Sequence, residues 1–129
     1  MQRRKARQLL LKALFQQDFR QADAEALIAD NGFEDAFLCD ALRGIQAHRV
    51  ELDRLIAGHT PGWTLDRLVA VDRNILRLAI YELHHTQTPA EVVINEAVEL
   101  AKRFGTERSP AFINGVLDRI WREQPSARP

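Results

Sequence analysis

The side chains with the most obvious potential for chemistry are a glutamate and a histidine three residues apart, Glu82 and His85. A Glu-x-x-His pair is part of the carboxylate-bridged di-iron site of some helical bundles. Glu96 and Glu99 follow in the next predicted helix, but no other histidine has a glutamate three residues before it. The site needs a second such pair, so we expect no metal centre. We expect Glu99 to form a surface ion pair with Arg103 instead.

Nucleophilic and nucleotide-dependent catalysis find equally little support. The chain has only two serines, of which Ser109 is predicted to cap a helix, and one cysteine, Cys39, inside a helical pattern. A single cysteine excludes an intramolecular disulfide and a cysteine-rich zinc site. The six glycines are scattered and form neither a G-x-G-x-x-G motif nor a P-loop. We therefore expect no enzyme activity and no cofactor.

A cluster of cations opens the first predicted helix: Arg3, Arg4, Lys5 and Arg7. Positive charge at a helix N-terminus opposes the macrodipole by about 0.3–1 kcal/mol per charge, so we do not expect stability to explain these residues. The free N–H groups of a first helical turn, the dipole and guanidinium groups all favour an anion such as phosphate. The alternative is a solvated or disordered basic N-terminus.

An aromatic side chain, Phe15, lies on the same predicted helix, eight residues after Arg7 and twelve after Arg3. This spacing is about two to three turns and places the three residues on or near one face. Single-stranded RNA is bound by stacking of bases on aromatic and guanidinium planes, whereas duplex DNA requires a dedicated recognition helix. The pattern thus favours RNA, although the helical pattern alone favours Phe15 as a core residue, and a place at the rim of the core would allow both roles.

Composition fits one ordinary globular domain of 129 residues, with 46% hydrophobic and 28% charged residues. The net charge of zero hides an asymmetry, because the first twelve residues carry five cations and no acid. A basic pole on a neutral body indicates an anionic partner. No apolar run is long enough for a membrane span, and the Leu9–Leu11 run is too short for a signal peptide. We expect a cytoplasmic protein.

Apolar spacing and capping residues predict the elements that position these side chains. The predicted helices are Arg3 to Phe19, Ala24 to Asp30, one long helix from about Glu34 to Ala57, a short helix capped by Thr64, a central helix capped by Asp72, Ala90 to Phe104 after Thr88-Pro89, and a last helix from Ser109-Pro110. The absence of period-two alternation predicts an all-α fold of about seven helices. We expect one domain over residues 1–123 and a frayed tail over 124–129.

Four motifs carry a resemblance to a known family: RRKAR…ALF from Arg3 to Phe15, VDRNILRLAIYEL from Val71 to Leu83, VINEAVELAKRFG from Val93 to Gly105, and SPAFINGVLD from Ser109 to Asp118. They resemble the NusB transcription antitermination factors, from Arg3 to about Arg122. The resemblance implies two small helix bundles that share the N-terminal helix. It also implies a non-enzymatic role, in which the protein pairs with the ribosomal protein NusE, binds boxA RNA and helps load an antitermination complex onto RNA polymerase.

The resemblance also implies which residues contact RNA. Arg3, Arg4, Lys5 and Arg7 match the family's arginine-rich RNA-binding front, and Phe15 matches an adjacent aromatic that is often tyrosine.

Arg108 and Phe112 fall in the family's second RNA-facing region. Relatives often have an acid where this chain has Arg108. We therefore expect RNA binding to depend more on salt and less on the protein partner, with Arg108 adding charge near Arg7.

For the protein partner, Asp66 and Asp72 match acidic positions that face the basic NusE. Asp72 has an alternative role as a helix N-cap. Glu96, which is not assigned to the partner, is interpreted as a polar link between helices.

Two other functions stay open. Some RNA cytosine methyltransferases carry a NusB-like domain, so the chain could be a detached RNA-recognition domain, although we expect no room for a catalytic domain. It could also be a homodimeric interaction bundle whose basic end contacts an acidic protein.

Overall fold

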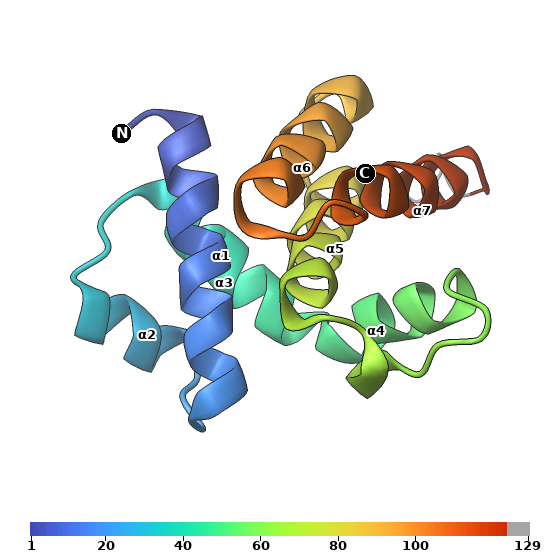
Figure 1. Ribbon diagram of the computed structural model, residues 1–129. Coiled ribbons are helices and arrows are strands. Elements are labelled where there is room, and N and C mark those ends of the chain that lie inside the picture. Colours follow the sequence, from blue (N-terminus) through green and yellow to red (C-terminus); the bar gives the residue numbers. More distant parts are fainter. Residues whose placement is uncertain (124–129) are drawn as a thin grey trace.

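The computed structural model describes residues 1–123, which form seven α-helices, one short 3₁₀-helix and no strand (Figure 1). In chain order these are α1 (Arg3–Phe19), α2 (Ala24–Asn31), α3 (Ala36–Ala47), α4 (Arg49–Gly58), η1 (Leu65–Arg67), α5 (Ala70–His85), α6 (Ala90–Phe104) and α7 (Ser109–Glu123). The all-α prediction is confirmed. The predicted frayed tail, 124–129, lies outside the described residues. Within residues 1–123, every helix is too short or too polar to cross a membrane.

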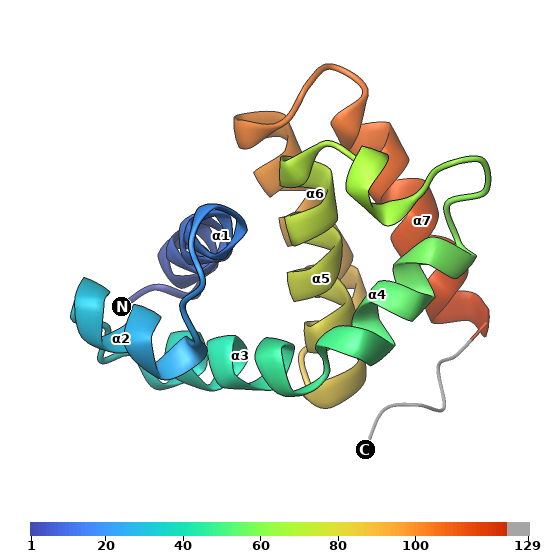
Figure 2. The ribbon, with the colours of Figure 1, turned by 90° about the horizontal axis from the view of Figure 1, so that it is seen from below.

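Helix α5 is the centre of the fold, as its apolar sequence predicts. It packs against α1 and α3 of one group of helices and against α4, α6 and α7 of the other. Seen from below, α1 and α3 lie to one side of α5, and α4 and α7 lie to the other side (Figure 2). The two groups of helices correspond to the two expected bundles. The helix that packs against both is α5, whereas α1 reaches α6 through ion pairs.

Buried polar side chains of α5 clamp α1 at both ends. Arg7 of α1 pairs with Glu82, and Asp18 accepts a hydrogen bond from Asn74 at 2.7 Å. The start of α1 thus contacts the end of α5, and the end of α1 contacts the start of α5, so the two helices run antiparallel. Arg77 binds Asp53 of α4 in the same way, at 2.8 and 3.2 Å. The apolar pattern of α5 predicts its burial but not these polar clamps.

The predicted long helix from Glu34 to Ala57 is wrong, because the structure divides it at His48. His48 has φ −106° and ψ 16°, which ends α3 and begins α4. Helix α3 packs against α1, α2 and α5, whereas α4 packs against α5 and η1. One straight helix could not follow both sets of partners.

Capping residues were predicted with mixed success. Asp23 caps α2, because its side chain accepts a hydrogen bond from the backbone N–H of Ala26. Asp72 does not cap α5, because that helix begins two residues earlier and its N-cap is Val69. At α6 the N-cap is Pro89 rather than the preceding threonine. Phe19, the last residue of α1, is 85% exposed because the buried stripe of the helix ends at Leu14.

Candidate nucleic-acid interface

The first turn of α1 presents three cations to solvent, Arg3, Arg4 and Lys5, with no acidic residue in that turn. Their exposure is as predicted. The guanidinium carbon of Arg3 lies 4.2 Å from the centre of the Phe37 ring, a distance typical of a cation–π contact. Phe37 therefore holds one face of Arg3 and leaves its N–H edge free for an anion.

Arg7 is not part of this exposed cluster, and the expectation of an exposed run from Arg3 to Arg7 is wrong. It is only 3% exposed. Its Nε donates to Glu82 Oε2 at 3.1 Å, and its Nη2 donates to Glu82 Oε1 at 2.5 Å. Arg7 precedes Leu10 and Leu11 by three and four residues and thus falls on the buried stripe of α1. That spacing was a signal for burial in the sequence.

Glu96 of α6 is shared by two arginines of α1. Arg4 donates to its two oxygens at 3.2 and 3.0 Å, and Arg7 Nη1 lies 3.5 Å from Oε1. This confirms the interpretation of Glu96 as a polar link between helices. It also corrects the expectation that stability does not explain the basic front, because Arg4 and Arg7 have carboxylate partners that offset the unfavourable dipole term.

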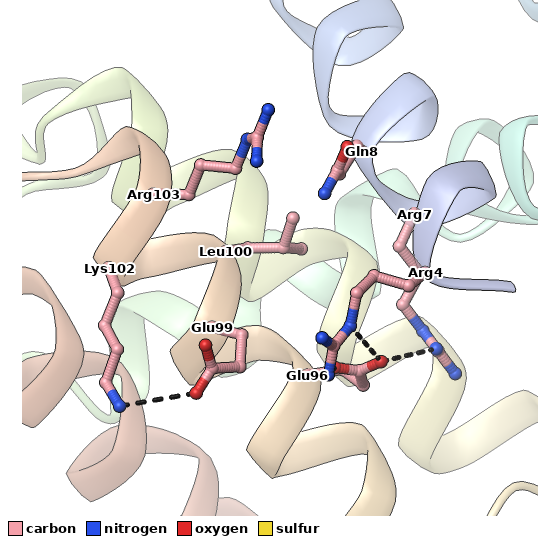
Figure 3. A pocket seen from close by; sticks show the side chains of 8 residues that line it. All are labelled: Arg4, Arg7, Gln8, Glu96, Glu99, Leu100, Lys102 and Arg103. Carbon is pink, nitrogen blue, oxygen red and sulfur yellow. Dashed lines mark hydrogen bonds and ion pairs between the residues drawn. The ribbon is translucent and has the colours of Figure 1, made fainter.

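A hollow of about 270 Å³ lies between α1 and α6, and we call it the α1–α6 hollow (Figure 3). Its lining residues are Arg4, Arg7, Gln8, Glu96, Glu99, Leu100, Lys102 and Arg103. Four cations face two carboxylates there, so the hollow has an excess of positive charge. Guanidinium and ammonium groups of this kind bind anions through charge-assisted hydrogen bonds.

The contribution of α6 to this hollow is not predicted from the sequence. The expected pair of Glu99 with Arg103 is wrong, because Glu99 binds Lys102 at 3.3 Å. Arg103 extends toward Gln8 of α1 (Figure 3), and none of the carboxylates in residues 1–123 pairs with it. The basic end of α6 also suits the helix dipole, so nothing in the sequence marked it as more than a favourable C-terminus.

Phe15 is half-buried and packs against the hydrophobic core. The structure therefore supports its interpretation as a core residue while leaving part of the ring accessible.

Arg108 and Phe112 lie at a second hollow, of about 300 Å³, which we call the Arg108 hollow. Its lining residues are Trp63, Arg67, Leu68, Val69, Asp72, Thr106, Arg108 and Phe112. Arg108 is exposed, Phe112 is half-buried and Trp63 is 55% exposed, so cationic and aromatic groups meet here. The two hollows share no lining residue. Arg7 and Arg108 therefore lie at different hollows, contrary to the expectation that they lie close together.

The two aspartates expected to face a protein partner differ in exposure. Asp66 is exposed on η1, whereas Asp72 is only 8% exposed and its Oδ1 has no hydrogen-bond partner. Burial raises the pKa of Asp72, and a hydrogen bond from Ser109 opposes this shift. Asp72 can therefore meet a partner only through the opening of the Arg108 hollow.

Comparison with known proteins gives a consistent result. The model of the NusB family matches residues 4–122. A Transcription antitermination protein NusB from Bacillus velezensis is 47% identical over 124 residues, which cover 93% of this chain and 95% of that protein. A protein of the same name from Solibacter usitatus is 46% identical, over 95% of this chain and 90% of that protein.

Solved structures agree in fold. A NusB structure from T. maritima matches with a TM-score of 0.85 and 42% identity, covering 95% of this chain and 92% of that one. A crystal structure of the antitermination factors NusB and NusE in complex with dsRNA matches with a TM-score of 0.76 and 26% identity, covering 94% and 96%.

Proposed function

Because the chain belongs to the NusB family, we propose that it is a transcription antitermination factor that binds boxA-type single-stranded RNA together with a NusE-type ribosomal protein. The observation that carries this proposal is the family match over residues 4–122. Relatives named Transcription antitermination protein NusB support the role. A structure of NusB and NusE with dsRNA supports the two partners. The role is one of binding, without a catalytic step.

The proposed RNA surface begins with Arg3, Arg4 and Lys5 and continues across the α1–α6 hollow to Lys102 and Arg103. These five residues are exposed and come from two helices that converge at the hollow. Guanidinium and ammonium groups bind phosphate oxygens through charge-assisted hydrogen bonds. Because these groups contact phosphates and not bases, the surface supplies affinity and orientation without a preference for RNA sequence.

Glu96 provides a way for Arg4 to bind phosphate at low cost. The carboxylate is shared, so Arg7 keeps it neutralised when Arg4 turns toward a phosphate. Arg7, which is buried, positions this arrangement and does not itself reach the RNA.

Base contacts are assigned to the aromatic side chains next to cations. Phe112 lies with Arg108 in the Arg108 hollow, and the exposed part of Phe15 lies on α1. Aromatic and guanidinium planes stack on unpaired bases, which is why we propose single-stranded RNA as the ligand.

Acidic residues near the Arg108 hollow are proposed to contact the protein partner. Asp66 is exposed on η1, and Asp72 lines the opening of the hollow. A basic ribosomal protein would complement their charge.

Titration of boxA RNA with the chain alone and with its NusE-type partner tests the function. We expect the partner to raise RNA affinity by about 5- to 150-fold, the range of ordinary coupling between two binding sites. Fluorescence anisotropy of labelled single-stranded RNA measures this, with a duplex of the same sequence as competitor. Equal affinity with and without the partner, or a preference for the duplex, would contradict the proposal.

Replacing Arg108 with alanine is expected to weaken RNA binding and to flatten its salt dependence. Loss of one phosphate contact lowers the slope of log K against log salt by about 0.7 for a single strand. The effect should be larger without the protein partner than with it. The matched control is Arg54→Ala, which removes an exposed cation from α4. A slope that is the same in both variants would show that Arg108 makes no contact with RNA.

A further inference from the structure

Two histidines and a glutamate from different helices meet where α3 joins α4. His48 is the residue at the break, Glu51 lies in the first turn of α4, and His85 ends α5. One potential ligand atom from each lies within 4.8 Å of the other two. The function proposed above uses none of the three. His85 belongs to the Glu-x-x-His motif of the sequence, but the glutamate of that motif is bound to Arg7.

The spacing of these atoms is close to what a tetrahedral metal ion requires. Zinc bonds of 2.0–2.2 Å to nitrogen and oxygen hold neighbouring ligand atoms roughly 3.3–3.6 Å apart. His48 Nδ1 and Glu51 Oε2 are already 3.5 Å apart. The other two separations are at most 4.8 Å, so each must shorten by no more than about 1.5 Å, which rotation of the exposed Glu51 side chain and a tilt of one imidazole can supply.

The His85 ring is in contact with the rings of His48 and Tyr81. The two imidazole rings stack with centres 4.0 Å apart and planes 17° apart, and Tyr81 stacks with His85 at 5.4 Å. Gly44 makes room for Tyr81, since a Cβ at this position would lie 2.1 Å from the tyrosine ring. Because stacked rings direct their lone pairs in parallel, one imidazole must tilt for both to meet a single ion.

His85 also has an unsatisfied atom. Its Nε2 is buried and has no hydrogen-bond partner in the structure, an arrangement that normally costs free energy. A metal ion would satisfy this nitrogen.

We propose that His48, Glu51 and His85 bind one divalent ion of the zinc type, with the fourth coordination position open to solvent through the exposed Glu51. Two imidazoles and one carboxylate are ligands that suit zinc, whereas magnesium and calcium prefer oxygen alone. The bound ion joins the start of α4 to the end of α5. It therefore stabilises the break at His48 and raises the melting temperature of the protein.

Metal titration of the tag-free chain tests this site. Zn²⁺ is added in competition with a chromogenic chelator, and Co²⁺ is added separately to record the visible absorption of a tetrahedral complex. We expect one ion per chain. Glu51→Gln should weaken Zn²⁺ binding by at least about tenfold, a loss typical of a disturbed metal site, and His85→Gln should abolish the Co²⁺ absorption. The matched control is Glu107→Gln, an exposed glutamate between α6 and α7.

Circular dichroism of each variant shows whether it is folded. If His85→Gln does not fold, the exposed Glu51 decides the question, because its replacement does not disturb the core. Equal Zn²⁺ affinity of Glu51→Gln and Glu107→Gln, or no saturable binding of one ion per chain, would overturn the proposal. RNA binding is measured in metal-free buffer, so the outcome of the metal titration does not bear on the proposed RNA-binding function. The two proposals therefore fail independently.

Discussion

Replacing Arg7 with alanine is expected to lower the free energy of unfolding by about 3–5 kcal/mol, the usual cost of breaking a buried ion pair from one side. The side chains of Arg7 and Glu82 are only 4% and 3% exposed. Without the guanidinium, the Glu82 carboxylate stays buried with two oxygens that lose charged donors. Such a loss is a large part of the free energy of unfolding of a whole domain, which is typically about 5–15 kcal/mol.

Urea denaturation at neutral pH measures this change. Arg4→Ala serves as the control, because Arg4 binds Glu96 from an exposed position and its loss should change stability little. Replacing both partners, Arg7→Met with Glu82→Leu, removes the unpaired charge and should recover most of the stability. An Arg7→Ala variant as stable as the natural chain would contradict the structural role assigned to this residue.

Replacing Arg3 and Arg4 together with alanine is expected to have the largest effect on RNA binding. Each arginine presents an exposed guanidinium at the first turn of α1. Hydrogen bonds to charged groups contribute about 1.5–3 kcal/mol each, so loss of two should weaken affinity by at least about a hundredfold at low salt. The slope of log K against log salt should fall by about 1.4, which corresponds to two phosphate contacts on a single strand.

Much of the fold was predictable because local patterns and packing agree. The apolar spacing of α1 predicts a helix with one buried stripe, and the nearly uniform apolar sequence of α5 predicts a central helix; the structure confirms both. The break at His48 could not be found in this way. It arises because α3 and α4 pack against different neighbours, and a residue pattern along one segment does not report which helices it meets.

The candidate site was predictable only in part. The exposed cations of the first turn follow from charge clustering, but the burial of Arg7 depends on a partner, Glu82, that is 75 residues away. Lys102 and Arg103 suit the C-terminus of any helix, so their place in the α1–α6 hollow emerges only when α6 is set beside α1. Long-range ion pairs decide which basic residues stabilise the fold and which are free for a ligand.

The shared carboxylate of Glu96 connects stability with function. Arg7 is bound to the core by Glu82, whereas Arg4 is bound only to Glu96, which Arg7 also neutralises. The two arginines therefore have different roles although they lie one turn apart on the same helix. Loss of Arg7 should lower stability, and loss of Arg4 should lower RNA affinity.

The most direct test of the central claim is the salt dependence of boxA RNA binding. It is measured by anisotropy for the natural chain, for Arg3→Ala with Arg4→Ala, and for the control Arg54→Ala with Arg119→Ala. The control removes two exposed cations from α4 and α7. We predict that the slope falls by about 1.4 in the first variant and stays unchanged in the control. The same slope and affinity in both double variants would contradict an RNA-binding surface at the start of α1.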